Sequence, residues 1–203
     1  ELPPPDLVGD PEDKAYVSYQ AGQYKVALDL WAQVLAGSPG RNDLRWHRAH
    51  VFYWQRQYGS AIGALRDMLA HLAPADDSLA YGLPETDILE YAMGIAYERA
   101  GNVDSAAEAY RRTLIANLGT YMARVRLSAI LLDRGDTVNA VREVSIALDV
   151  APSEPLTLAH YGAVLVRVGR PNDALKPLQS GVHTDPAYAT PYLVLGMAYT
   201  DLH

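Results

Sequence analysis

Two histidines one helical turn apart are the residues of this sequence best placed for metal chemistry. His47 and His50 have the i, i+3 spacing that puts two side chains on one face of a helix, and neutral imidazoles are common zinc ligands. A third ligand is not apparent, because Asp43 has the simpler role of an acidic residue at a helix start. The remaining histidines are isolated, at positions 71, 160, 183 and 203. The sequence therefore favours no metal site, and we expect no cofactor.

Catalytic patterns are also missing from the sequence. It contains no nucleophile elbow, P-loop, dinucleotide fingerprint or HExxH motif, and no pair of carboxylates stands out for acid–base work. Because there is no cysteine, a cysteine nucleophile, a thiolate zinc site and a disulfide framework are excluded. We therefore expect that the chain is not an enzyme.

Composition narrows the remaining classes. The 203 residues are 49% hydrophobic and 20% charged, which argues against disorder. No apolar run approaches the ~20 residues that cross a bilayer, so we expect no direct membrane insertion. A net charge of −7 disfavours nucleic acid, because affinity for phosphates depends on cationic side chains. Aromatic bulk is mostly polar-tipped, with 14 Tyr and 3 Trp against 1 Phe.

The elements that position these residues follow from an internal repeat. Shifting the sequence by 34 residues aligns small residues in several columns, with one offset of 45 in the middle of the chain: Ala27 with Ala61; Ala106, Ala140 and Ala174; Gly101, Gly135 and Gly169; and Gly94, Ser128, Gly162 and Gly196. A period of this length indicates a repeat protein in which each unit buries its apolar surface against its neighbours.

Each unit is predicted to be two helices joined by a short turn. Apolar residues recur at intervals of three and four, as in Leu127, Ile130 and Leu131 and then in Val141, Val144 and Leu148. Glycines 22, 101, 135 and 169 are placed to end the first helix in a left-handed conformation. Asp10 and Thr190, each followed by proline, are predicted N-caps.

The repeat resembles the tetratricopeptide repeat over nearly the whole chain. The best single match is Met93-Gly94-x2-Tyr97, Gly101 and Ala106-x3-Tyr110. The resemblance implies an all-α, right-handed superhelical solenoid of helix-turn-helix units that acts as a protein-interaction scaffold. The implied division is a leader at 1–7, two units at 8–75, an insertion at 76–86, three units at 87–188, and the first helix of an incomplete sixth unit at 189–203.

The resemblance also implies a concave groove lined by the first helix of each unit, where a protein or peptide would bind as an extended or helical segment. Tyr, Trp and Arg are frequent interface anchors, although several of these aromatics could instead pack between units. The predicted groove residues are Tyr16, Tyr19, Trp46, His47, His50, Tyr53, Tyr91, Ile95, Arg99, Arg126 and Arg167.

Two narrower readings concern the partner. The clamp with which some tetratricopeptide domains hold an acidic chaperone tail is absent, because the corresponding positions are Glu12 and Tyr16, His50, Ile88 and Ala92. The stretch Trp46 to Tyr58 resembles bacterial envelope proteins that carry such repeats, which leaves a polysaccharide partner in an export system as an alternative. The Pro-rich leader and the absence of cysteine slightly favour a periplasmic setting over the cytoplasm, without deciding the compartment.

A third expectation concerns the last helix. Leu193, Val194 and Met197 are apolar and no second helix follows to cover them, so they are candidates for self-association of the chain into a homo-oligomer. The alternatives are that this helix simply caps the array, or that the sequence is a piece of a longer protein.

Overall fold

The computed structural model describes residues 9–72 and 86–202, and in these ranges it contains helices and no strand. The chain forms two compact units, Glu1–Asn102 and Val103–His203. This confirms the predicted all-α class. The predicted leader at 1–7 lies outside the described residues, as does the predicted insertion at 76–86 except Thr86, which begins a helix.

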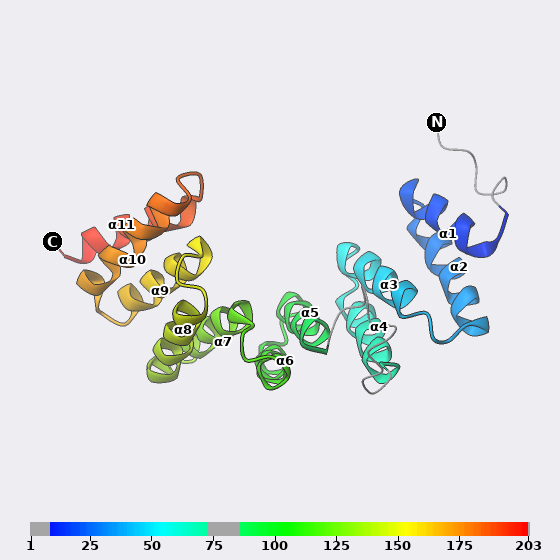
Figure 1. The fold of residues 1–203 in the computed structure, drawn as a ribbon, viewed down its shortest axis with the longest axis horizontal. Helices are drawn as coiled ribbons and strands as arrows, with labels where there is room; N and C mark the ends of the chain where they lie inside the picture. The colour runs from blue at the N-terminus through cyan, green and yellow to red at the C-terminus, as the bar shows by residue number, and fades with distance from the viewer. Residues whose placement is uncertain (1–8, 73–85, 203) are drawn as a thin grey trace. The chain divides into compact units, whose positions relative to one another are not determined.

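The first unit holds five described helices, seen from blue to green in Figure 1. They are α1 (Pro11–Gln20), α2 (Tyr24–Gly37), α3 (Asn42–Trp54), α4 (Tyr58–Ala70) and α5 (Thr86–Arg99). Helices α1 and α2 form one hairpin, α3 and α4 form the next, and α5 packs on α4. The core of the first hairpin is built around the buried Ala15, Ala27 and Trp31.

The second unit holds six described helices: α6 (Val103–Ala116), α7 (Tyr121–Asp133), α8 (Thr137–Val150), α9 (Pro155–Arg167), α10 (Pro171–Thr184) and α11 (Ala189–Asp201). Helices α7 and α8 form one hairpin and α9 and α10 another, and α11 packs against both members of the latter. None of the described helices of either unit is long and apolar enough to cross a bilayer.

Small residues allow the helices of a hairpin to approach closely, as their columns predict. Ala174 and Leu178 of α10 are fully buried. A methyl group added at Gly162 of α9 would lie under 3.0 Å from Leu178 Cγ, which is inside van der Waals contact. In the preceding hairpin the same column holds Ser128, whose buried hydroxyl donates to the Ala140 carbonyl at 2.8 Å. The repeating small residues are therefore a packing requirement rather than a matter of composition.

The turn inside each hairpin has one repeated geometry. Glycines 22, 101, 135 and 169 all have φ between 74° and 78°, which confirms the prediction made for them. Each turn closes with a Schellman hydrogen bond, such as Gln23 N–H to Ser18 O at 2.8 Å. In the α3–α4 hairpin the position belongs to Arg56, with φ 60°, the only positive φ outside glycine in the described chain.

Of the two predicted N-caps, the one at the first helix is confirmed and the one at the last helix is not. Asp10 caps α1, because its Oδ1 accepts from the backbone N–H groups of Glu12 at 2.8 Å and Asp13 at 3.1 Å. The prediction that Thr190 caps the last helix is wrong. Helix α11 begins at Ala189 with Tyr188 as its N-cap, and Thr190 lies inside it. Pro191, in the first turn of this helix, is buried and lies against Gly181 of α10.

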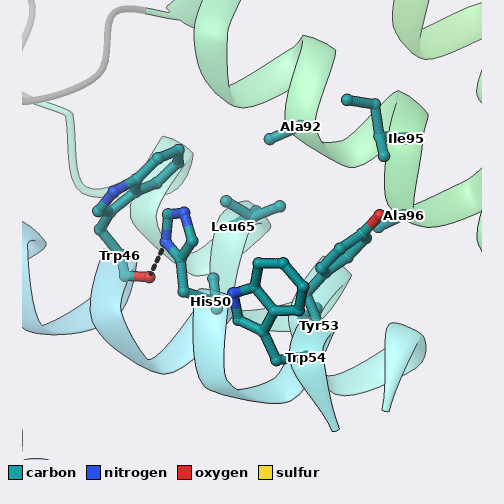
Figure 2. A pocket seen from close by; sticks show the side chains of 10 residues that line it. Trp46, His50, Tyr53, Trp54, Leu65, Ala92, Ile95 and Ala96 are labelled. Carbon is teal, nitrogen blue, oxygen red and sulfur yellow. Dashed lines mark hydrogen bonds between the residues drawn. The ribbon is translucent and has the colours of Figure 1, made fainter. Parts of the chain in front are cut away.

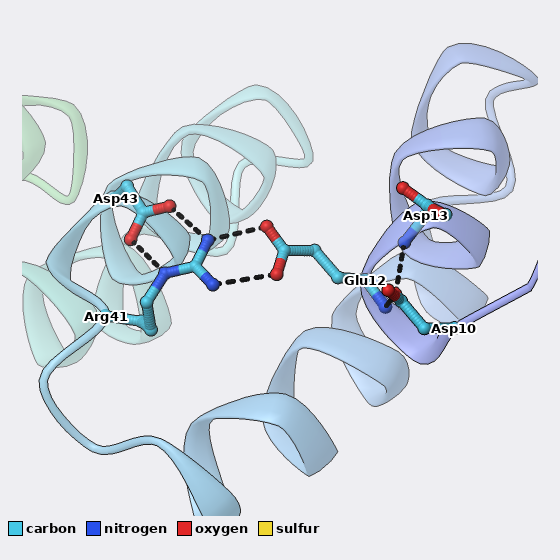
Figure 3. Close-up of polar contacts among 5 residues, drawn as sticks. All are labelled: Asp10, Glu12, Asp13, Arg41 and Asp43. Carbon is cyan, nitrogen blue, oxygen red and sulfur yellow. Dashed lines mark hydrogen bonds and ion pairs between the residues drawn. The ribbon is translucent and has the colours of Figure 1, made fainter.

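One arginine connects the first two hairpins (Figure 3). Arg41 precedes α3 and donates to both carboxylate oxygens of Glu12 on α1, at 2.6 and 2.7 Å, and to those of Asp43, at 2.7 and 2.9 Å. These hydrogen bonds hold the pKa values of both carboxyl groups below their ordinary range. Glu12 is therefore paired with the scaffold, and Asp43 is tied to Arg41 as well as lying in the first turn of α3.

Candidate functional site

An apolar pocket of about 230 Å³ opens between α3, α4 and α5 (Figure 2). One wall comes from α3, because Trp46, His50 and Tyr53 follow the i, i+4, i+7 spacing of one helix face. The other wall comes from α5 and the floor from α4. The full set of lining residues is Trp46, Ala49, His50, Tyr53, Trp54, Ala61, Leu65, Ala92, Ile95 and Ala96.

Ring contacts fix the wall that α3 supplies. Trp46 and His50 meet edge to face, with centroids 4.4 Å apart and planes at 76°, and Tyr53 and Trp54 do the same at 6.0 Å and 81°. Trp54 lies at the rim and remains 74% exposed. Such crossed rings give a concave, divided surface rather than one flat aromatic platform.

The opposite wall leaves space because two of its three residues are alanines. Ala92, Ile95 and Ala96 of α5 face the α3 rings across the pocket (Figure 2). Helix α5 is held against α4 by Arg66, whose Nη2 donates to the Tyr97 hydroxyl at 2.8 Å. The pocket is therefore a preformed space bounded by three packed helices within one unit.

The hydrogen bond that His50 makes defines the tautomer of its ring in this pocket. Its Nδ1 lies 3.1 Å from the backbone oxygen of Trp46, and because a carbonyl only accepts, Nδ1 must carry the proton. Figure 2 shows the other ring nitrogen at the far end of the ring from the α3 backbone, on the side of Leu65 and Ala92.

Four of the predicted groove residues, Trp46, His50, Tyr53 and Ile95, are thus brought together in one pocket. Trp54 and the alanines that create the space also line the pocket, and the alanines are not among the predicted groove residues. Tyr91 is half-buried on α5 without lining the pocket. Arg99 is exposed at the end of the same helix.

Three other predicted groove residues belong to the packing of the first hairpin. Tyr16 and Tyr19 are half-buried against the core around Trp31, with ring centroids 5.9 and 5.6 Å from its indole. His47 stacks on the same indole at 5.7 Å, and burial lowers the pKa of its imidazole. His47 and His50 therefore contact different neighbours, since His50 lies against Trp46.

The two remaining groove residues, Arg126 and Arg167, are exposed on α7 and α9 of the second unit. Arg167 pairs with Asp133 at 2.8 Å. A groove that runs through both units stays a prediction. Within residues 9–72 and 86–202, no group of three His, Asp or Glu side chains is arranged to hold a metal ion.

The predicted self-association residues divide between surface and core. Leu193 and Met197 are 69% and 47% exposed on α11, beside a shallow hollow that Gly196, Thr200 and Asp201 also line. The prediction that Val194 is free for self-association is wrong. Its side chain is 6% exposed and packs with Leu165 and Leu178, because it points toward the α9–α10 hairpin. Only the outward face of α11 is available to another molecule.

Comparisons with known proteins agree with this architecture. Residues 91–155 match a family model described as tetratricopeptide repeat. No curated protein matches the sequence. Among solved structures, similar chains include YrrB, titled a TPR protein with an unusual peptide-binding site, with 14% identity, a TM-score of 0.66, and coverage of 90% of this chain and 89% of that one.

Two further structures extend the comparison. MamA has 16% identity and a TM-score of 0.68, over 89% of this chain and 97% of its own. The C-terminal part of a TPR repeat-containing protein from Cytophaga hutchinsonii has 12% identity and a TM-score of 0.71, over 93% and 70%. At such identities the likeness concerns the fold. Residues 91–155 thus carry the tetratricopeptide repeat, and the solved structures show the same fold over about nine tenths of the chain.

Proposed function

We propose that this protein is a non-catalytic interaction scaffold that holds an apolar side chain of a protein or peptide partner in the pocket between α3, α4 and α5. The tetratricopeptide fold is that of an interaction scaffold. The observation that carries the specific proposal is the pocket itself, which is concave, lined by four rings of α3 and faced by two alanines and one isoleucine of α5. Aromatic-lined hollows of this kind accept the anchoring side chain of a partner.

The geometry favours a peptide over a glycan. A sugar stacks on the open face of a ring, whereas the rings of Trp46, His50, Tyr53 and Trp54 stand edge to face and leave a narrow space between walls. The volume of about 230 Å³ is below the ~300 Å³ at which small-molecule sites begin. A single side chain carried by an extended or helical segment suits this space, and the rest of the segment would cross the neighbouring helix surfaces.

The proposal is tested with a random peptide library displayed on phage. We expect the wild-type chain to enrich peptides that share an apolar residue at one position. Ala92→Phe fills the pocket and should abolish that enrichment. Ala32→Phe adds the same ring to the exposed surface of α2 and should preserve it. Equal enrichment by both variants, or binding on a glycan array that Ala92→Phe removes, would contradict the proposal.

The same peptides then allow single anchors to be measured. Trp46→Ala should weaken binding by roughly 1–2 kcal/mol if the ring is a buried anchor. Tyr192→Ala removes a ring that is 48% exposed on α11 of the other unit, and should leave the affinity unchanged. Helicity measured by circular dichroism must stay the same in both variants for the comparison to count.

Self-association through α11 is a second candidate function, with a second copy of this chain as the occupant. This candidate rests on a difference in how equivalent glycines of two repeats are covered. Gly162 of α9 is covered by Leu178, whereas nothing lies within 4 Å of a methyl group placed at Gly196, 34 residues later. Gly196 is exposed on α11 beside Leu193 and Met197, so the outward face of this helix carries uncovered apolar surface.

Sedimentation velocity across a range of concentrations tests this second candidate. The wild type should show a concentration-dependent dimer, and Leu193→Glu with Met197→Glu should be monomeric. Val138→Glu with Ile115→Glu places the same charges on residues of α8 and α6 that are 80% and 82% exposed, and should leave the dimer intact. A wild type that is monomeric at all concentrations would exclude this role.

A further inference from the structure

We infer that the pocket between α3, α4 and α5 selects a tryptophan side chain of the partner, through a hydrogen bond from the indole N–H to Nε2 of His50. This inference rests on the proposed function and specifies its ligand. It combines three features of the site: the protonation of the His50 ring, the apolar surroundings of its second nitrogen, and the size of the space.

The first step is the state of the imidazole. Nδ1 of His50 donates to the carbonyl oxygen of Trp46 at 3.1 Å, so in the neutral ring Nε2 carries a lone pair and no proton. No residue in the described part of the chain makes a hydrogen bond to Nε2. The hydrogen bond to the α3 backbone therefore holds the ring so that Nε2 of His50 is a fixed hydrogen-bond acceptor at the pocket wall.

The second step is the surroundings of that acceptor. Leu65 and Ala92 lie on its side of the ring (Figure 2), and the remaining lining residues from α4 and α5 are aliphatic. A ligand that fills the pocket displaces water from Nε2. A ligand without a donor would leave the acceptor unpaired in an apolar space, and this loss is costly.

The third step is the chemistry of the occupant. A space of about 230 Å³ holds one large side chain, and its ring walls favour an aromatic body. Tryptophan combines that body with a ring nitrogen that only donates. Tyrosine could also donate, but its hydroxyl would bring oxygen lone pairs without a partner into the apolar space; phenylalanine and leucine have no donor, and lysine would bring an unpaired charge. The indole of tryptophan is therefore the side chain that satisfies both the shape and the acceptor.

Indole and 1-methylindole are the matched probes, because methylation removes the donor and keeps the ring. Binding is followed by the ¹H–¹⁵N signals of the tryptophan side chains of the protein. Trp46 and Trp54 line the pocket and should shift, while Trp31, with 0% exposure, serves as the internal reference. We expect indole to bind the wild type at least fivefold more tightly than 1-methylindole.

His50→Phe provides the second arm, because it keeps a ring at this position and removes the acceptor. Both probes should then bind with the same affinity. Equal affinities for the two probes in the wild type, or an undiminished preference for indole in His50→Phe, would overturn the selection of tryptophan and leave the pocket as a general apolar site. If neither probe nor toluene shifts Trp46 or Trp54, the proposed pocket function fails as well.

Discussion

The imidazole of His47 lies stacked on the indole of Trp31, with ring centroids 5.7 Å apart and planes at 22°. Trp31 is fully buried in α2, and His47 reaches it from α3, so this contact joins two hairpins through aromatic surface. Burial lowers the pKa of His47, which means that the fold prefers the neutral ring. The first prediction follows from this preference.

Stability should fall as the solution becomes acidic below the ordinary histidine pKa of 6.5. Above that value the ring is neutral in both folded and unfolded chains. Below it the unfolded chain takes up a proton that the folded chain resists, so the free energy of unfolding decreases until the lower folded pKa is reached. His160 acts in the same direction, because burial first and Arg126 second lower its pKa.

Urea unfolding between about pH 8 and about pH 5 measures this effect, since most carboxylates titrate below that range. His47→Phe retains a ring on Trp31 and should flatten the pH dependence, and adding His160→Phe should flatten it further. His183→Gln changes an exposed residue of α10 and serves as the control. Parallel curves for the wild type and the double variant would contradict the assignment.

Arg56→Gly should stabilise the protein. Arg56 holds φ 60° at the position that glycine occupies in the other turns, and it is exposed. A left-handed residue with a Cβ costs roughly 1–2 kcal/mol, partly offset by the greater freedom of glycine in the unfolded chain. The net gain in free energy of unfolding should be about 0.5–1 kcal/mol, measured by urea denaturation.

The reverse substitution, Gly22→Arg, supplies the control in the same unit. Nothing lies within 4 Å of a methyl group at Gly22, so only backbone strain should act, and we expect a loss of about 1 kcal/mol. If Arg56→Gly is also destabilising, the side chain of Arg56 would have to make contacts that outweigh its strain.

The sequence predicts the fold well because steric demands repeat along the chain. A left-handed turn and a close helix contact each restrict the residue type, so glycine and alanine columns reveal the period and the hairpins. The same logic does not extend to the site. Tyr16 and Trp46 are both aromatic residues of a first helix, yet Tyr16 covers Trp31, whose indole stands where other repeats have Leu65 or Val144.

The pocket itself depends on alanines, whose side chains do not indicate a binding site in the sequence. Ala92 and Ala96 leave space opposite the α3 rings, and a sequence pattern does not distinguish an alanine that closes a contact from one that opens a cavity. Val194 illustrates the same limit, because its hydrophobicity matches that of Leu193 while one turns inward and the other outward. These outcomes are set by helix rotation against the neighbouring hairpin.

Gly162→Ala and Gly196→Ala should have opposite effects although they change the same column of the repeat. At Gly162 the new methyl group would overlap Leu178, which is fully buried and has little room to move, so we expect a loss of roughly 1–3 kcal/mol. At Gly196 the space is open and alanine favours the helix, so we expect a gain of up to about 1 kcal/mol. Thermal and urea unfolding of both variants, at a concentration where the wild type is monomeric, decide the matter. Similar losses in both would show that Gly196 is covered in solution.

Arg124 and Glu143 form a buried ion pair at 2.8 Å between α7 and α8, with both side chains 10% exposed. Glu143→Leu should cost about 3–5 kcal/mol, because it leaves the guanidinium of Arg124 buried with only the Leu118 carbonyl at 3.3 Å. The double variant with Arg124→Met removes both charges and should return to within about 1 kcal/mol of the wild type.

The exposed ion pair between Arg167 and Asp133 serves as the control. These two side chains are also 2.8 Å apart but are exposed, so Asp133→Ala should cost less than about 1 kcal/mol. Urea denaturation of the wild type, of Glu143→Leu and Arg124→Met alone, and of the double variant gives the coupling energy. A double variant as unstable as Glu143→Leu would mean that the pair contributes through packing rather than through charge.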